Sequence, residues 1–342
     1  MLLYMHIPFC DSKCHYCSFN SFTKHHNLKR DYMQALQRQL TFELERFSLA
    51  KNQIASVFVG GGTPSCVEAA LYEPIFARLA PYLSEECEIT FEANPNSASL
   101  EWLRAIKELG ATRISFGVQS FDEHKLRFLG RAHDPEDAIE AIANAHKAGF
   151  VHINCDIIYN VKGDTKELLQ KDIAQAVALP IDHISAYALT IEKNTPFAQG
   201  GVQSREDFSF VVRDLIPFEQ YEVSNFGQYR SRHNIGYWQL RNYIGVGAGA
   251  VGFYEDRRYY PTSDLFGYIA DPLGQSVEHL SPEDIRTEKI FLGLRSCVGV
   301  EDALVDERKA ALLCQEGKLI YRDGRYFNPN YFLADEIALF LL

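Results

Sequence analysis

The chain has 342 residues, enough for one large α/β domain and one or two small ones, each with its own core. Forty-five acidic against 34 basic side chains give a formal charge of −11, which disfavours a polyanionic partner such as nucleic acid. No window approaches the roughly 18 apolar residues of a transmembrane segment, and MLLYMHIPFC lacks the basic start of a signal peptide. These features predict a cytoplasmic protein.

Short β-rich runs alternate with helical patterns from the first residues onward. Buried strands are expected at residues 2–7, 54–59, 88–92, 113–117, 151–158 and 183–189. Helices are expected at residues 29–47, 69–83, 100–109, 135–148 and 166–179, and Gly110 and Gly149 follow two of them as C-caps. Six strands joined by crossover helices predict a parallel, partial barrel with its functional residues at the carboxyl ends of the strands.

The loop after the first strand carries Cys10, Cys14 and Cys17 in HIPFCDSKCHYCSFNS. Three thiolates on one short loop can hold an iron–sulfur cluster, and a cubane of four irons then keeps one iron open to a small molecule. The alternative is a tetrahedral zinc site completed by His6 or His15. The remaining five cysteines are expected to be buried free thiols in a reducing compartment, namely Cys66, Cys87, Cys155, Cys297 and Cys314.

Polar residues mark the ends of the next four strands. The second strand ends in Gly60-Gly61-Gly62-Thr63-Pro64, where glycines let the backbone approach a ligand closely. The third, fourth and fifth strands carry Glu92, Gln119 and Asp156, and Arg131 follows in LGRAHD. Each residue alone is also consistent with a hydrogen-bonded strand end. Together they predict a pocket in which carboxylates bind hydroxyl groups and the arginine binds a carboxylate.

The motifs HIPFC…CxYCxF, GGGTP, FEANP, GVQSFD, LGRAH and CDIIY resemble the radical S-adenosylmethionine (SAM) superfamily, and within it the oxygen-independent coproporphyrinogen III oxidases and the HemW-type heme chaperones. The resemblance implies a 4Fe-4S cluster on the three cysteines and a SAM site formed by Tyr4, Tyr16, Gly61, Gly62, Thr63, Glu92, Gln119, Arg131 and Asp156. One departure is Asn160-Val161-Lys162, where relatives usually read GLP.

Two features separate the branches of this family. The oxidases are typified by the pattern CxxxCxxCxC, which has a further cysteine two positions after the third. This chain has Phe19 at that position. The segment RHNIGYW resembles the HNxxYW heme-binding motif of the chaperones, which implies His233, Asn234, Tyr237 and Trp238 as heme-binding residues. The alternative for this segment is a polar helix start with an aromatic core face.

The resemblance therefore predicts a heme chaperone that delivers heme to acceptor proteins. An oxidase acting on coproporphyrinogen III and a heme-responsive sensor remain alternatives. The resemblance leaves open whether the protein dimerises or contacts membrane proteins.

The C-terminal part changes in organisation. Helices are expected at residues 282–295 and 307–313, and a hairpin at 319–327 turning at Asp323-Gly324. This order resembles the small winged-helix-like domain of the family, but the acidic residues Glu301, Asp302, Asp306 and Glu307 make it a poor partner for phosphate. The expected division is a barrel at 1–195, a connecting extension with the heme motif at 196–265, and the small α+β domain at 266–342.

Overall fold

The structure is a computed structural model that describes residues 1–342. Its centre is an open sheet of eleven strands in the order β11-β10-β9-β8-β1-β2-β3-β4-β5-β6-β7. The first six strands are β1 Leu2–Ile7, β2 Ile54–Gly61, β3 Leu83–Ala93, β4 Arg113–Gln119, β5 His152–Tyr159 and β6 His183–Ala188. Each is parallel to the next, which confirms the predicted partial barrel. The two ends of the sheet are not hydrogen-bonded to each other, so the barrel is not closed.

Five further strands extend the sheet beyond this prediction. They are β7 Asn225–Gly227, β8 Tyr243–Val246, β9 Gly252–Tyr254, β10 Arg257–Pro261 and β11 Gln275–His279. β8 lies parallel to β1, and β9, β10 and β11 follow as antiparallel neighbours. The chain after the sixth strand therefore adds to both sides of the barrel sheet.

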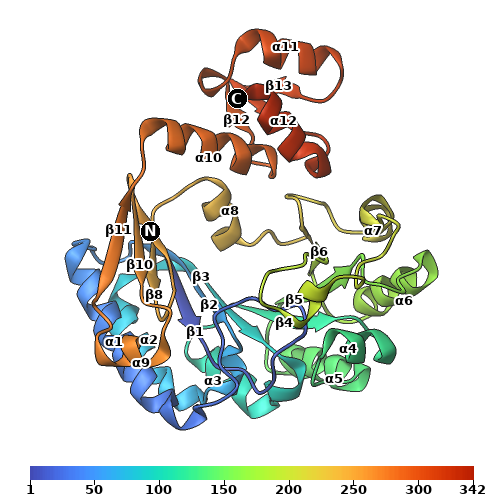
Figure 1. The fold of residues 1–342 in the computed structure, drawn as a ribbon. Helices are drawn as coiled ribbons and strands as arrows, with labels where there is room; N and C mark the ends of the chain where they lie inside the picture. Colours follow the sequence, from blue (N-terminus) through green and yellow to red (C-terminus); the bar gives the residue numbers. More distant parts are fainter.

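Helices cover the outer face of the sheet (Figure 1). They are α1 Lys29–Arg46, α2 Glu73–Leu79, α3 Leu100–Glu108, α4 Glu123–Leu129, α5 Pro135–Lys147 and α6 Lys166–Val177. Three short helices follow in the chain, namely α7 Ser209–Leu215, α8 Arg232–Trp238 and α9 Leu265–Ala270. The predicted helix at 69–83 was too long. Pro81 lies in a 3-10 turn at Ala80–Tyr82, and β3 begins at Leu83.

Successive side chains of the six barrel strands alternate between two environments. Val57 and Val59 on β2 belong to the 53-residue hydrophobic cluster that includes the covering helices. Their neighbours Ser56, Phe58 and Gly60 have the opposite parity and point to the concave side. The concave side is unusually polar for a parallel sheet, since it is formed by Glu88, Thr90, Glu92, Arg113, Ser115, Asn154, Asp156, His183 and Ser185.

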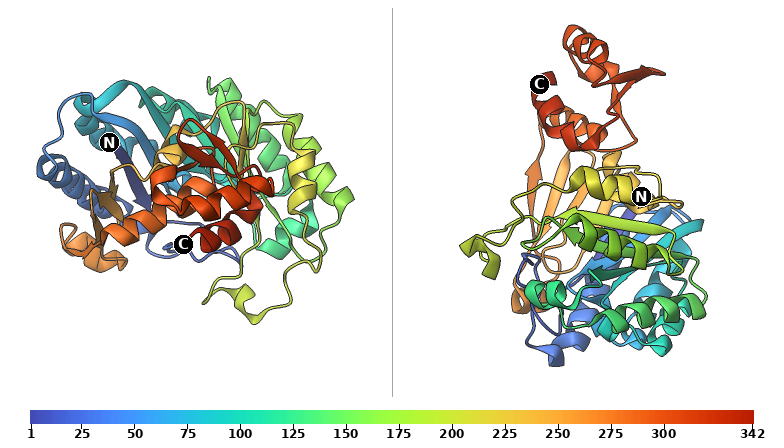
Figure 2. Two further views of the ribbon diagram at one scale, coloured as in Figure 1. Left: turned by 90° about the horizontal axis from the view of Figure 1, so that it is seen from above. Right: turned by 90° about the vertical axis from the view of Figure 1, so that its right-hand side faces the viewer.

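The C-terminal unit lies over the amino ends of the barrel strands, and the cysteine loop lies at the opposite end (Figures 1 and 2). The unit contains α10 Pro282–Leu294, β12 Val300–Glu301, α11 Glu307–Gln315, β13 Ile320–Arg322, β14 Arg325–Phe327 and α12 Ala334–Leu341. The predicted hairpin is confirmed by the pairing of β13 with β14. An 11-residue hydrophobic cluster between Ile290 and Leu341 forms its own core. The domain boundaries at 195/196 and 265/266 stay a prediction. None of the helices is both long enough and apolar enough to cross a membrane.

Candidate functional site

A cavity of about 370 Å³ opens at the carboxyl ends of the barrel strands. Its lining contains the three cysteines of the loop, Cys10, Cys14 and Cys17. It also contains eight of the nine residues that the family resemblance assigns to SAM, namely Tyr16, Gly61, Gly62, Thr63, Glu92, Gln119, Arg131 and Asp156. Residues that are 146 positions apart in sequence thus share one small cavity, as the strand-end rule predicts.

The cysteine loop is held against the sheet by backbone and side-chain contacts. The amide of Cys10 donates to the carbonyl of Phe22 at 3.1 Å. The Thr63 hydroxyl donates to the Cys10 sulfur at 3.4 Å, and the Arg131 guanidinium donates to the Cys14 sulfur at 3.1 Å. Burial raises the pKa of the Cys10 and Cys17 thiols, so binding of a metal cluster must release their protons.

The glycines at the end of β2 bring the backbone close to the loop. A Cβ atom on Gly62 would lie 2.8 Å from the Phe9 carbonyl and 3.1 Å from the Cys10 sulfur. Gly61 has φ +113°, and a Cβ there would lie 2.5 Å from the His6 ring. A side chain at either position would therefore displace the wall that carries the cysteines.

Two carboxylates face the cavity from β3 and β5, the two strands that flank β4. Glu92 accepts a hydrogen bond from the Gly61 amide at 3.1 Å, and Asp156 accepts one from Asn154 at 2.6 Å. Burial, and then the nearby Asp156, raises the pKa of Glu92 to about 7. Burial also raises the pKa of Asp156. Such buried carboxyl groups suit the hydroxyl and amino groups of a ligand that replaces water.

Arg131 organises the opposite wall of the cavity. Its guanidinium donates to the Asn94 side-chain oxygen at 2.7 Å and to the Gly117 carbonyl at 2.5 Å. Its Nε is buried without a partner, which fits a ligand carboxylate. Asn94 was not predicted as a site residue, although it follows Glu92 by two positions in FEANP.

Gln119 reaches the cavity through an irregularity in β4. The pairing of β4 with β5 shifts register between Phe116 and Gln119, and Gln119 adopts a left-handed φ of 73°. Such strain in a non-glycine residue is typical of functional sites. Gln119 was predicted as a site residue, but its left-handed conformation was not predicted.

Tyr4 is the predicted SAM residue that does not line the cavity. Its hydroxyl lies 2.9 Å from His6 Nδ1, and His6 Nε2 lies 2.7 Å from the Asn20 carbonyl. Both ring nitrogens of His6 are therefore engaged, while His15 Nδ1 lies 2.9 Å from the Phe128 carbonyl. These contacts leave no free ring nitrogen on His6 to complete a tetrahedral zinc site.

The Asn160-Val161-Lys162 departure lies outside the cavity lining. Asn160 has φ 62°, a left-handed conformation that asparagine tolerates better than most residues and that glycine adopts freely. Its side chain donates to Asp207 at 2.9 Å and accepts from the Phe208 amide at 2.8 Å. Asn160 is thus held by contacts with residues that do not line the cavity.

The HNIGYW segment forms α8, at the amino ends of the strands. Glu88 of β3 accepts hydrogen bonds from the amides of Arg232 and His233, both at 2.9 Å, and thereby fixes the start of the helix. His233 is 1% exposed, and its Nδ1 lies 2.8 Å from the Ser56 hydroxyl. Burial lowers the pKa of His233 to about 3, and its Nε2 has no partner. The imidazole is neutral and chemically free to bind a metal, but it is enclosed.

Of the other three residues of this motif, Tyr237 contacts the imidazole of His233. The Tyr237 ring lies edge-on to the His233 ring with centroids 4.6 Å apart. Asn234, Tyr237 and Trp238 are half-buried, and Trp238 Nε1 has no hydrogen-bond partner. The structure therefore brings His233 and Tyr237 together on the barrel side of α8.

The expectation for the other cysteines is correct for Cys87 and Cys155, which are buried. It is wrong for Cys66, Cys297 and Cys314, which are half-buried. All are free thiols.

The fold and the cavity together define a protein of the radical SAM class. Residues 4–176 match the profile of the Radical SAM superfamily, to which the chain belongs. Among solved structures, coproporphyrinogen III oxidase (HemN) from Escherichia coli, a radical SAM enzyme, has the same fold. It superposes with a TM-score of 0.80 over 99% of this chain and 89% of that one, at 18% sequence identity.

Curated relatives narrow the assignment. The chain is 32% identical to the heme chaperone HemW of Bacillus subtilis, over 87% of this chain and 84% of the relative. It is 36% identical to HemW of Escherichia coli K12, over 73% of this chain and 69% of the relative. Within the superfamily, the chain belongs to the HemW family.

Glu92 provides a test that separates stability from binding. Because its pKa is raised in the folded state, the cofactor-free protein loses stability as pH rises from about 4.5 to about 7. Glu92→Gln cannot ionise, so its stability relative to the wild type should rise by about 1–3 kcal/mol between pH 4 and pH 8. Denaturant titrations at the two pH values measure this difference.

The same variant should bind SAM at least about tenfold more weakly in calorimetry on cluster-loaded protein. Glu101→Gln, an exposed change on α3, is the control and should alter neither result. Unchanged SAM affinity in Glu92→Gln would contradict the assigned pocket.

Proposed function

We propose that the protein is a heme chaperone that carries a 4Fe-4S cluster and SAM, binds heme and delivers it to acceptor proteins. The proposal is supported by the HemW names of its relatives and by the HNIGYW segment. The main observation in support of this proposal is that two regions with different chemical groups lie apart in the structure. Sulfur and carboxylate groups gather at the carboxyl ends of the strands, and a neutral imidazole with a free nitrogen lies at the amino ends.

The distance between the two regions follows from one strand. Ser56, which contacts His233, and Gly61, which lines the cavity, are five residues apart on β2, or roughly 16 Å at the usual rise of a strand. A ligand near His233 would therefore not be in contact with one at the cysteine loop. This arrangement suits a protein whose heme is cargo.

Each residue of the cavity has a role in this proposal. Cys10, Cys14 and Cys17 hold the cluster, which when bound supplies an open iron for SAM and an electron. Glu92 and Asp156 accept hydrogen bonds from SAM, and Arg131 pairs with its carboxylate.

Phe19 supports a chaperone over an oxidase. It occupies the position at which the oxidase pattern has a further cysteine. Phe19 is 67% exposed, and it lines the cavity without offering a sulfur ligand.

The deciding experiment is a heme-transfer assay. The heme-loaded protein is expected to pass heme to an apo-cytochrome, monitored by the cytochrome absorbance. In parallel, the cluster-loaded protein with SAM and a reductant should not decarboxylate coproporphyrinogen III. Retention of heme without transfer would favour the sensor, and turnover of coproporphyrinogen III would favour the oxidase.

A further inference from the structure

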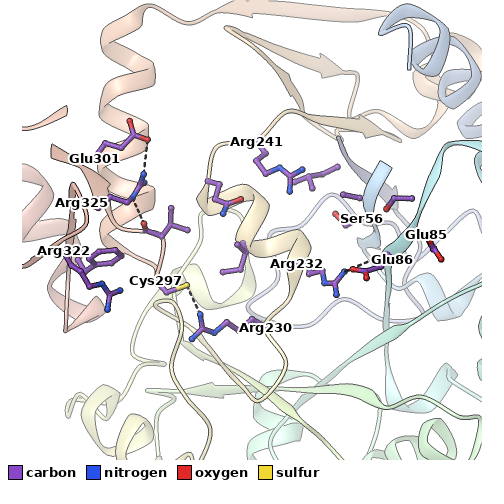
Figure 3. A pocket seen from close by; sticks show the side chains of 17 residues that line it. Ser56, Glu85, Glu86, Arg230, Arg232, Arg241, Cys297, Glu301, Arg322 and Arg325 are labelled. Carbon is purple, nitrogen blue, oxygen red and sulfur yellow. Dashed lines mark hydrogen bonds and ion pairs between the residues drawn. The ribbon is translucent and has the colours of Figure 1, made fainter. Parts of the chain in front are cut away.

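A second cavity, larger than that of the cysteine loop, shares no lining residue with it. It measures about 1310 Å³, is open to solvent, and lies between the amino ends of the barrel strands, α8 and the C-terminal unit (Figure 3). Ser56 of β2, Ile235 of α8 and Phe327 of β14 are among its lining residues. Typical small-molecule pockets have about 300–1,000 Å³, so this cavity has room for a large ligand.

The lining is rich in arginine, although the chain as a whole is acidic. Five arginines line the cavity against three glutamates, whereas the full chain has a formal charge of −11. They come from both walls, as Arg230, Arg232 and Arg241 lie on the barrel side and Arg322 and Arg325 on the C-terminal unit (Figure 3). A cavity with this lining attracts anions.

Three of the arginines already have strong partners. Arg230 pairs with Glu219 at 2.7 Å, outside the lining. Arg232 pairs with Glu86 at 3.5 Å. Arg325 pairs with Glu301 at 3.1 Å and also donates to the carbonyls of Val298 and Gly299 at 3.0 Å. Each of these ion pairs lies within one wall of the cavity.

The two remaining arginines are available to a ligand. The Arg241 side chain makes no hydrogen bond or ion pair, and its residue is exposed. Arg322 has only a 3.9 Å contact with the exposed Asp323, and its guanidinium lies 4.7 Å from the centre of the Phe327 ring. Two cations on opposite walls of a cavity that is also lined by Ile235, Val298 and Phe327 suit a large apolar ligand with two acidic groups.

We propose that this cavity binds heme, with Arg241 and Arg322 as the anchors of its two propionate carboxylates. The inference rests on the proposed chaperone function and names where the cargo is held. Heme has the required features, since its flat apolar ring carries two carboxylates, and arginine binds carboxylates bidentately.

The position of α8 links the cavity to the HNIGYW segment. Arg232, Ile235 and Gln239 face the cavity, whereas His233 lies on the barrel side of the same helix. Ser56, the partner of His233 Nδ1, itself lines the cavity. The arginines therefore bind heme next to α8, and movement of this helix is required before His233 can reach the iron.

The test is an absorbance titration of the full chain with ferric heme. R241Q/R322Q is expected to bind heme at least about tenfold more weakly than the wild type, because two charge-assisted contacts are lost. The matched control is R104Q/R205Q. It changes two exposed arginines that lie outside the cavity lining and make no side-chain hydrogen bond or ion pair, and it should bind heme within about twofold of the wild type. Melting temperatures of both variants should equal that of the wild type.

Two further ligands make the result specific. Heme dimethyl ester, which lacks free carboxylates, should bind the wild type as weakly as heme binds R241Q/R322Q. Iron-free protoporphyrin IX should show the same dependence on the arginines. Equal heme binding by the wild type and R241Q/R322Q would overturn the inference and leave the chaperone proposal intact. Arginine-dependent binding of protoporphyrin without uptake of heme would overturn the chaperone proposal and support the cavity as a porphyrin site.

Discussion

Replacing any one of Cys10, Cys14 and Cys17 with alanine is expected to remove most of the iron and sulfide from anaerobically reconstituted protein. The three sulfurs line one cavity, and a cubane held by only two thiolates would expose two of its irons. Iron and sulfide analysis, together with the charge-transfer absorbance of the cluster, measures the loss. Wild-type protein should hold four irons per chain, the number in one cubane cluster.

Cys314→Ala is the matched control, because Cys314 is a half-buried thiol of α11 in the C-terminal unit. It should retain the full cluster. A triple variant of Cys10, Cys14 and Cys17 that still carried a full cluster would rule out this loop as its ligand.

His233→Ala is expected to weaken heme binding at least about tenfold and to shift the Soret band, with the cluster and SAM binding unchanged. The variant removes the free Nε2 nitrogen, and nothing on α8 lines the cavity of the cysteine loop. Because His233 is 1% exposed, its truncation should also lower the free energy of unfolding by about 1–3 kcal/mol. Absorbance titration and denaturant unfolding measure the two effects.

Ser56→Ala separates these effects, since it removes the 2.8 Å contact with Nδ1 but keeps the imidazole. It should retain the wild-type Soret position. Added imidazole should restore that position in His233→Gly. If His233→Ala keeps the wild-type spectrum, His233 is a structural residue of the helix start.

The parts of the fold that were predicted correctly are those with strong local signals. β1 to β6 are mostly buried, and the positive φ of Gly110 and Gly149 matches the predicted helix ends. β9 and β10 were not predicted. β9 has only three residues and β10 has the sequence RRYYP, and neither shows an alternation of apolar and polar residues that would distinguish it from a loop. Their pairing depends on β8, which lies beside β1 only through tertiary packing.

The candidate site likewise contains residues that local sequence signals predict and residues whose contacts depend on tertiary packing. The residues of the cavity were predicted because parallel strands bring their ends together. The engagement of Tyr4 with His6 depends on a side-chain contact that no motif spacing encodes. The arginine-lined cavity was missed because Arg241 and Arg322 are 81 positions apart and meet only when the C-terminal unit lies over the barrel.

The alternation along the barrel strands has a consequence for the evolution of this protein. On β2, Val57 and Val59 lie in the core, whereas Ser56 and Gly60 lie beside His233 and Glu92. Selection for stability and selection for ligand binding therefore act on adjacent residues and hardly overlap. We therefore expect the apolar face to tolerate substitutions that preserve volume, whereas substitutions on the concave face should change ligand binding.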